Sequence, residues 1–495
     1  RDRDAGGWTD DNRIDRLIDR DRIWAAKRAV LHAVYAEFVR SSGERRAAFD
    51  AFVIRQGPAL RDFATWCALA EHYGTNWREW PAEFRHPRSA AVTEFRAAHP
   101  REVEFHAWLQ WVVADQFREA HRVARDVGMP IGILHDLAVG VDPDGADAWA
   151  DADVLARGVT LGAPADMYNQ QGQRWNLAAW HPDRLAERDF LPLRETIRPW
   201  LEIGGGLRID HVLGFFRQWW VVDGAAAADG AYLRLDPEAL LGVVLIEAAR
   251  TESLVIGEDL GVVPPGVREF LSQRGILGTS ILWFERSPAG APLPASEWRR
   301  DCLATVTTHD LPPTFGYLTG VHVDLRARLG LLQRDAAEER AHDEADRLAW
   351  LAALADAGLL DSAVVAAVAA DDGRPWSERI EPYLPAVTSA LHAYLGRTPA
   401  LLRGVYLPDV VGDRRPVNQP GTSDQYPNWC IRMSDADGSV VLVEDLREQF
   451  TERARELTRL IAGGPESASV RASTTSPTDI SVDISDRAGS GEGRA

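Results

Sequence analysis

The sequence predicts an α/β fold of the (β/α)8 TIM-barrel class with helical insertions, because short apolar runs recur along it and each leads into an acidic residue. The runs cover residues 205–216, 254–257 and 303–308, and they reach Asp210, Glu258 and Asp310. Acids that follow successive parallel strands meet at one mouth of a barrel, where catalytic residues lie. Each acid alone is weak evidence for a site. Three in this arrangement favour a shared active site over three unrelated surface acids.

The run that reaches Asp210 has the features of a strand, because it is short and apolar and glycines bound both of its ends. Side chains alternate across a strand, so Arg208 and Asp210 share one face and Ile209 points to the other. An arginine beside an aspartate keeps the carboxylate ionised and restricts its rotamers, which suits a carboxylate nucleophile. A structural ion pair at a strand end is the alternative, and this run alone slightly favours it.

Helices are expected in the N-terminal quarter, after a charged opening at 1–11. Apolar residues at helical spacing mark a helix around 31–38, a second helix after the Gly57-Pro58 break, and a third over 105–127 that ends at Gly128. The tryptophans of this region are expected to pack between helices: Trp66, Trp77, Trp80, Trp108 and Trp111. The first strand is expected at 131–134. It ends in His135 and Asp136, in line with the later acids.

A polar segment at 162–176 is expected to bind ligand, because it combines amides and aromatics with glycine and proline breaks. Amides exchange hydrogen bonds with sugar hydroxyls, and Trp175 or Tyr168 would stack on a sugar ring. An ordinary surface loop is the alternative. The preceding residues 142–145 are interpreted as a turn rather than a calcium loop, because the closing glutamate of such a loop is absent.

The second half of the chain continues the alternation of strands and helices. We expect residues 218–221 to pack in the barrel wall, and residues 324–395 to form a charged, helical insertion without evident chemistry. Further strands are expected over 278–285 and 401–406, and further helices over 237–250 and 446–461. From residue 463 onward the chain is rich in Ser, Thr, Gly and Asp, which predicts a disordered tail.

The composition excludes several classes of protein. A formal net charge of −19 over 495 residues argues against nucleic-acid and membrane-surface partners, which are themselves anionic. Three widely spaced cysteines fit neither a disulfide framework nor a metal motif, so we expect reduced thiols and a cytoplasmic protein. No apolar stretch approaches about 18 residues and no leader opens the chain, so we expect neither a transmembrane span nor secretion.

Six segments in one order resemble a known family: GAPADMYNQQGQRW, GLRIDHVLGFF, VIGEDLGVVPPGV, GTSILWFE, TVTTHDLPPTFGYL and VNQPGTSDQYPNW. The chain is identified as similar to the amylomaltases, the 4-alpha-glucanotransferases of glycoside hydrolase family 77. The segment IGILHDLAVGVDPDGADAW resembles the actinobacterial type. The resemblance implies that Asp210 is the nucleophile, Glu258 the general acid/base and Asp310 the acid that stabilises the transition state. It implies sugar contacts for Arg208, His211, His309, Asp136, Gln173, Trp175, Tyr168 and Asn418.

The chain departs from this family at its start, where the family has two barrel strands and a sugar-binding loop. The strand at Ile131 would be the third of eight, so the expected barrel is incomplete, as from a truncated reading frame. The expected organisation is a helical subdomain (1–128) inserted between barrel strands, barrel strands three to eight (129–462) and the tail (463–495). The family also has an aromatic residue where this chain has Met167.

The resemblance implies a retaining double displacement on maltodextrins, with the carboxyls of Asp210 and Glu258 about 5 Å apart. We expect a raised pKa for Glu258 and, beside Arg208, a low one for Asp210. The residues alone do not separate Glu258 from Asp259. The resemblance implies an alpha-glucan partner and neither cofactor nor metal, and it says nothing of oligomeric state. The alternatives are a related retaining hydrolase or debranching enzyme, and an inactive truncated fragment that urea would unfold with poor cooperativity.

Overall fold

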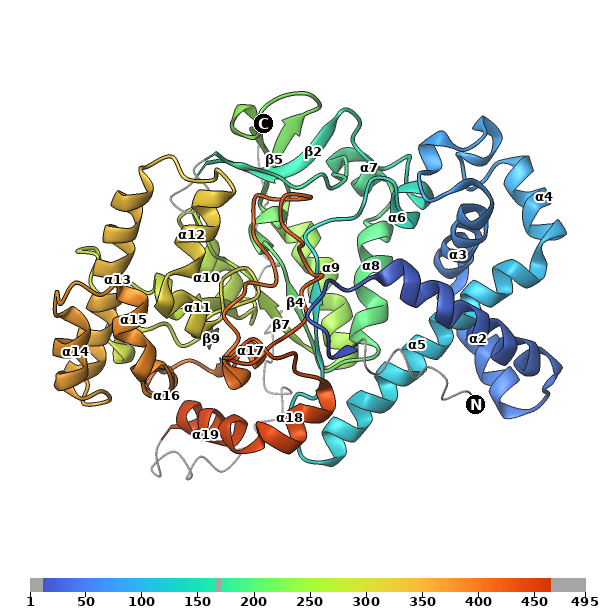
Figure 1. The fold of residues 1–495 in the computed structure, drawn as a ribbon. Helices are drawn as coiled ribbons and strands as arrows, with labels where there is room; N and C mark the ends of the chain where they lie inside the picture. The colour runs from blue at the N-terminus through green and yellow to red at the C-terminus, as the bar shows by residue number, and fades with distance from the viewer. Residues whose placement is uncertain (1–11, 166–170, 464–495) are drawn as a thin grey trace, which may run out of the picture.

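The computed structural model describes residues 12–165 and 171–463 of the 495-residue chain, and its fold is α/β (Figure 1). Apart from Gly463, the predicted disordered tail lies outside the described residues, and so do Met167 and Tyr168. Within the described ranges, no helix is both long enough and apolar enough to cross a lipid bilayer.

Within the residues that the structure describes, six short parallel strands form the centre of the fold and neighbour one another in their sequence order. They are β1 (Leu134–Leu137), β4 (Gly206–Ile209), β7 (Leu254–Gly257), β8 (Gly278–Ile281), β9 (Cys302–Thr305) and β10 (Leu402–Gly404). The first three form one ladder and the last three another. A parallel bridge between Ile256 and Leu277 joins the ladders. Since all six strands run in one direction, their carboxyl ends lie along the same edge.

Two strand boundaries differ from the predicted ones for local reasons. The first strand begins at Leu134 rather than Ile131, because Gly132 has a φ of +79°, which a strand does not accommodate. His135 and Asp136 therefore lie inside β1 instead of after it. The strand β8 ends at Ile281, since Leu282–Phe284 turn into a 3-10 helix.

The prediction that residues 218–221 pack in a parallel barrel wall is wrong. They belong to β5 (Arg217–Val222), which pairs antiparallel with β2 (Val159–Ala163) and with β6 (Ala231–Arg234). The short β3 (Gln173–Arg174) completes this second sheet, in the order β3-β2-β5-β6. Figure 1 shows it above the parallel strands, on the side to which their carboxyl ends point. This sheet carries the polar segment that was expected to bind ligand.

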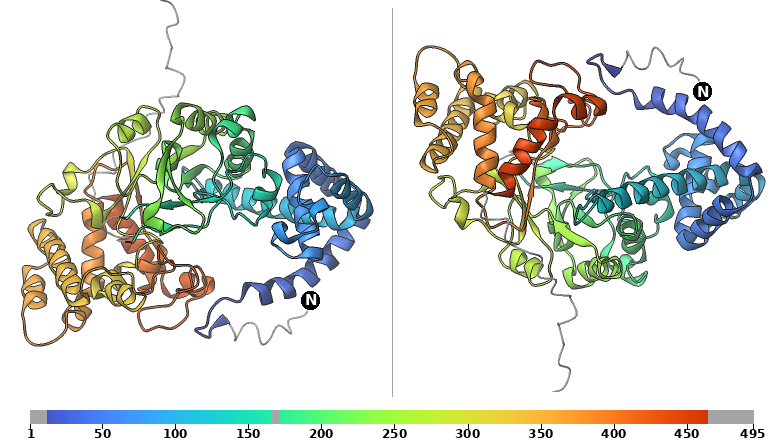
Figure 2. Two further views of the ribbon diagram at one scale, coloured as in Figure 1. Left: turned by 90° about the horizontal axis from the view of Figure 1, so that it is seen from above. Right: turned by 90° about the horizontal axis from the view of Figure 1, so that it is seen from below.

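The N-terminal helices form a lobe at one side of the molecule (Figures 1 and 2). They are α2 (Arg20–Arg40), α3 (Glu44–Tyr73), α4 (Ala90–Ala98) and α5 (Pro100–Asp126), with 3-10 turns at Trp77–Glu79 and Ala82–Phe84. The expected break is present as a kink inside α3, where Gly57 has a φ of +60°. Trp80, Trp108 and Trp111 are buried as predicted, and Trp66 and Trp77 pack against the core. The lobe has its own aromatic core.

The C-terminal half of α5 connects this lobe to the strands, as the views of Figure 2 show. The His121 Nδ1 atom accepts a hydrogen bond from the backbone N–H of Ile133 at 3.2 Å, just before β1. Phe117 packs edge-on against His135 within β1, with ring centroids 5.4 Å apart. The helix α5 therefore attaches the helical lobe to β1, the first parallel strand among the described residues.

The remaining helices surround the strands or form the insertion. They are α6 (Ala146–Ala150), α7 (Pro182–Glu187), α8 (Leu191–Leu201), α9 (Pro237–Thr251), α10 (Val267–Ser272), α11 (Thr314–Thr319), α12 (Val321–Arg328), α13 (Ala336–Asp356), α14 (Ser362–Ala369), α15 (Trp376–Ile380), α16 (Leu384–Leu395), α17 (Leu407–Val411), α18 (Val443–Gln449) and α19 (Thr451–Ala462). The predicted insertion is helical, as expected. The single closing helix of the prediction is instead two helices, α18 and α19.

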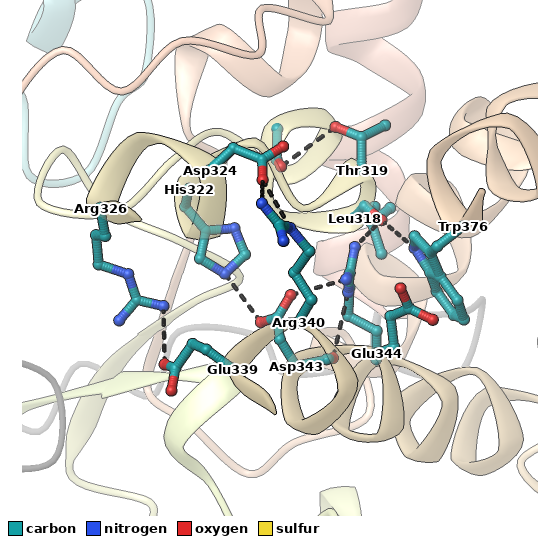
Figure 3. Close-up of polar contacts among 12 residues, drawn as sticks. Leu318, Thr319, His322, Asp324, Arg326, Glu339, Arg340, Asp343, Glu344 and Trp376 are labelled. Carbon is teal, nitrogen blue, oxygen red and sulfur yellow. Dashed lines mark hydrogen bonds and ion pairs between the residues drawn. The ribbon is translucent and has the colours of Figure 1, made fainter. Parts of the chain in front are cut away.

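A buried polar cluster joins α13 to α11 and α12 (Figure 3). In α13, Asp343 bonds His322 of α12 at 2.9 Å and Arg347 at 2.8 Å. The Arg347 guanidinium also donates to the carbonyl of Leu318, at the end of α11, at 2.7 Å, and it lies over the ring of Trp376. Because every charge in the cluster is paired, we interpret it as a structural joint between α11, α12 and α13.

Candidate active site

Three of the predicted acids lie at or beyond the carboxyl ends of parallel strands. Asp210 directly follows β4, Glu258 directly follows β7, and Asp310 lies five residues beyond the end of β9. A fourth, Asp136, lies in β1 directly opposite Arg208 of β4 in the ladder. The backbone N–H of Glu258 donates to the carbonyl of Ile209 at 2.9 Å, which fixes the two strand ends beside each other.

Arg208 holds two of these carboxylates at once. Its guanidinium lies 2.6 Å from Oδ1 of Asp136 and 3.1 Å from Oδ1 of Asp210. Burial opposes a charge on Arg208, yet the charges of Asp136 and Asp210 outweigh burial and raise its pKa. The side chain of Asp210 remains 32% exposed. Arg208 therefore holds the carboxylate of Asp210 without covering it.

The expectation of a low pKa for Asp210 is wrong. Burial is the largest influence, and it raises the pKa of Asp210 above its ordinary value. The Arg208 charge opposes this rise, while the neighbouring carboxylates of Asp310 and Asp136 add to it. The sequence shows the adjacent arginine but neither the burial nor the two distant acids, which is why it predicts the wrong direction.

Glu258 is 9% exposed, and burial raises its pKa to about 7, with a further contribution from the charge of Asp210. The backbone N–H groups of His211 and Leu260 donate to its two oxygens at 2.9 and 2.6 Å and oppose the rise. Each carboxyl oxygen has two acceptor positions, so the side chain can hold both bonds and a proton. The preceding Gly257 is required, because a Cβ there would lie 2.8 Å from Val212. This environment fits the raised pKa that was expected.

The structure distinguishes Glu258 from its neighbour Asp259, which the sequence could not. Asp259 has no exposed surface, and its oxygens accept bonds from the guanidinium of Arg299 and from the backbone N–H of Thr279, the latter at 2.8 Å. Arg268 lies 3.1 Å away on the same carboxylate. A carboxylate whose oxygens are occupied in this way has no free position for a substrate, so Asp259 is a structural residue.

Asp310 is held by both polar neighbours that the sequence analysis named. His309 lies 3.3 Å from one oxygen, and the side-chain amide of Asn418 donates to the other at 2.8 Å. Burial raises the pKa of Asp310, but these two partners outweigh it and leave the pKa below its ordinary value. For His309, burial lowers the pKa and Asp310 more than restores it, so its pKa is raised. Asp310 and His309 thus stabilise each other as an ion pair.

The three carboxylates act on one another electrostatically. The charge of Asp310 raises the pKa of Asp210, and the charge of Asp210 raises that of Glu258. Arg208 acts on all three acids, since it lowers the pKa of Asp210, of Glu258 and of Asp310. Interactions of this kind fall off with distance, so they require the acids to be close together. Asp210, Glu258 and Asp310 therefore form one acidic cluster around Arg208.

The polar segment before β4 contributes Trp175 to this cluster. The ring of Trp175 meets His211 edge-on at 5.3 Å, and its indole N–H donates to the side chain of Gln173 at 3.1 Å. Burial lowers the pKa of His211 to about 4, so this residue is a neutral imidazole near neutral pH. Gln173 and Trp175 thus lie beside the acids, whereas Tyr168 falls outside the described residues.

The sequence analysis assigned no role to Trp429, although the structure places it at the site. Its ring lies 5.3 Å from that of His309, and 47% of the residue is exposed. It has a left-handed backbone conformation, with φ of +61°. The signal that could have found it is an aromatic residue in a glycine-, proline- and amide-rich loop, the same composition that singled out Trp175.

An α/β fold that gathers acids beyond the carboxyl ends of its parallel strands defines a class of proteins with a polar site at that edge. Comparison with protein families makes the class specific. The chain belongs to the 4-alpha-glucanotransferase family, glycoside hydrolase family 77, whose model matches residues 3–437. This confirms the resemblance stated from the sequence.

Individual relatives agree with this assignment. The chain is 51% identical over 464 residues to a 4-alpha-glucanotransferase of Mycobacterium tuberculosis. The aligned region covers 93% of this chain and 60% of that protein. It superposes on the crystal structure of amylomaltase from Corynebacterium glutamicum with a TM-score of 0.79 and 42% identity, over 92% of this chain and 62% of that one. The Streptococcus agalactiae amylomaltase in complex with acarbose shares the fold, with a TM-score of 0.68, 20% identity, and coverage of 90% and 81%. The chain thus spans about 60% of the length of the curated relative.

Proposed function

We propose that this chain carries the catalytic site of a retaining 4-alpha-glucanotransferase that transfers alpha-1,4-glucan segments between maltodextrins. The single observation that supports this most strongly is the pairing of Glu258, whose pKa is raised to about 7, with Asp210, whose side chain contacts Arg208 and is 32% exposed. A carboxylic acid that is half protonated near neutral pH can donate a proton, and a second carboxylate beside it can attack. The membership of the family, whose named members are glucanotransferases, supports the same reaction.

In the proposed reaction, Asp210 attacks the anomeric carbon while Glu258 protonates the glycosidic oxygen that leaves. The covalent glycosyl-Asp210 is then resolved by the hydroxyl of an acceptor sugar, which Glu258 deprotonates. The ionised Asp310 stabilises the positive charge that develops on the sugar ring in the transition state. After the two steps, the new bond lies on the same face of the sugar ring as the bond that was cleaved. The configuration at the anomeric carbon is therefore retained.

The remaining polar residues would bind the glucan. Arg208, His309, Asn418 and Asp136 present donors and acceptors around the ring that reacts. Trp175, beside His211, and Trp429, beside His309, offer aromatic faces for neighbouring sugars. An acarbose complex of a protein with this fold is consistent with oligosaccharide as the ligand class.

We also propose that the six parallel strands are strands three to eight of a (β/α)8 barrel, with the helical lobe (1–128) inserted between barrel strands. The sequential order of the strands and the acids at one edge support this arrangement. The related activity of hydrolysis is the alternative reaction, since the same two carboxylates perform it when water replaces the acceptor.

The test is the action of the purified chain on maltotriose. Transfer yields glucose together with chains longer than maltotriose, whereas hydrolysis yields glucose and maltose only. Asp210→Asn is expected to abolish both. In Glu258→Gln, α-maltotriosyl fluoride should load the nucleophile, because fluoride leaves without a proton, and peptide mass spectrometry should locate the sugar on Asp210. Three results would each contradict the proposal. They are undiminished turnover by Asp210→Asn, label on a residue other than Asp210, and failure of the unsubstituted protein to produce chains longer than maltotriose.

A further inference from the structure

A cluster of two histidines and a glutamate lies in the N-terminal lobe, on elements that do not contribute to the acidic site. His72 is in the last turn of α3, His99 joins α4 to α5, and Glu102 is in the first turn of α5. Nε2 of His72 lies 2.8 Å from one oxygen of Glu102, and Nδ1 of His99 lies 2.9 Å from the other. The three possible ligand atoms all lie within 4.8 Å of one another. We propose that His72, His99 and Glu102 bind a divalent transition-metal ion, with zinc as the best fit.

The donor set is the reason for choosing zinc. Imidazole nitrogen with carboxylate oxygen suits zinc, whereas magnesium and calcium require mainly oxygen ligands. Metal–ligand distances of about 2.0–2.2 Å place neighbouring ligand atoms of a tetrahedral zinc ion roughly 3.3 Å apart. The two observed contacts therefore need to open by about half an ångström. The ligand atoms of the other pair, which lie within 4.8 Å of each other, must reach the same spacing.

The histidine rings are already oriented by an aromatic neighbour. The ring of His99 stacks on Phe95 of α4 with centroids 4.4 Å apart, and His72 meets the same ring edge-on at 5.4 Å. Phe95 is 8% exposed, so it is a fixed support. Neighbours that fix ring orientation reduce the entropy lost on metal binding. The side chains of the cluster are 34–40% exposed, so water can supply the fourth ligand.

The charges around Glu102 also favour a cation. Among the described residues, no arginine or lysine forms an ion pair with Glu102, whose carboxylate is approached by the two histidines alone. Both oxygens are thus directed at ring nitrogens that can each exchange a proton for a metal. A plain hydrogen-bonded cluster without metal is the competing interpretation, and it is an outcome of the test below.

A metal at this position would tie the end of α3 to the junction of α4 and α5. It would bridge His72 and His99, which lie far apart in the sequence but have ring centroids 5.1 Å apart. Because a metal that binds only the folded state stabilises it in proportion to its affinity and concentration, the lobe should become more stable when zinc is added.

The experiment uses the chelator-treated full chain and titrates it with cobalt(II), whose visible absorption reports four-coordinate binding, and then with zinc. We expect one cobalt per chain, displacement of its spectrum by zinc, and a higher Tm with zinc. His72→Ala, His99→Ala and Glu102→Gln should each weaken binding at least hundredfold. Glu102→Gln keeps hydrogen-bonding capacity, so its loss of binding would not reflect unfolding. The matched control is His86→Ala, because His86 faces a single carboxylate, Asp153, at 3.4 Å, and it should bind as the unsubstituted chain does.

Two results would overturn the proposal. One is the absence of a cobalt spectrum with the chain in excess, which would leave a hydrogen-bonded cluster only. The other is unchanged cobalt binding in the His72→Ala and Glu102→Gln variants, which would place the metal on other histidines of the thirteen in the chain.

Discussion

Replacement of Glu258 by glutamine removes the proposed proton donor while nearly preserving its shape. The pKa of about 7 is a rise from 4.5, which corresponds to about 3 kcal/mol of preference for the protonated form. Loss of general acid catalysis lowers rates by roughly 10²- to 10⁴-fold. We therefore expect transfer from maltotriose to fall by that factor in Glu258→Gln, whereas reaction of α-maltotriosyl fluoride in its first step should change little.

The dependence of kcat/KM on pH tests this prediction more specifically. Above pH 7 the folded protein releases the proton of Glu258, so about half the molecules are active at pH 7 and about a tenth at pH 8. The kcat/KM of the unsubstituted chain should fall about tenfold per unit beyond that point. The residual activity of Glu258→Gln should lack this basic limb.

The neighbouring acid provides the control. Asp259→Asn removes the charge of a fully buried carboxylate that pairs with Arg299 and Arg268, so this variant should unfold at lower urea concentration. The basic limb of its kcat/KM profile should stay near pH 7. A basic limb that persists in Glu258→Gln, or that moves only in Asp259→Asn, would refute the assignment of the proton donor.

Three further predictions follow from contacts around the site and the insertion. Asn418→Ala removes a donor that lowers the pKa of Asp310, so that pKa should rise, as NMR titration of the carboxyl group would measure. Trp429→Ala should raise KM for maltodextrins about fivefold with little change in kcat, since an exposed ring contributes about 1 kcal/mol of stacking, and Trp429→Phe should restore most of the loss. Arg347→Ala leaves the buried Asp343 without its arginine and should lower the free energy of unfolding by about 3–5 kcal/mol in urea titration, with an unchanged pH profile.

Local patterns account for what could be predicted. The strands before Asp210, Glu258 and Asp310 are present where apolar runs and flanking glycines placed them. The kink at Gly57 and the helical insertion also follow from residues adjacent in sequence. The acids could be grouped from sequence alone, because parallel strands present their carboxyl ends at one edge whatever the intervening chain does.

Errors arose where the outcome depended on distant partners. The residues of β5 have the composition of a barrel strand, but β2 and β6 recruit them into an antiparallel sheet. The pKa of Asp210 was misjudged because Asp310 and Asp136, far away in sequence, counteract the visible Arg208. No sequence pattern links Trp429 to His309, or His72 to His99.

The sequence by itself determined the strand-and-acid motifs, the family and the residue types available for chemistry, because each depends on a few consecutive side chains. Tertiary structure alone decided which of two adjacent acids faces the site. Glu258 and Asp259 differ in sequence by one methylene and one position, yet the alternation of side chains at the end of β7 sends one toward Asp210 and the other into a pair of arginines. Burial and charge at those two destinations, rather than the identity of the side chain, set which carboxyl can hold a proton near pH 7.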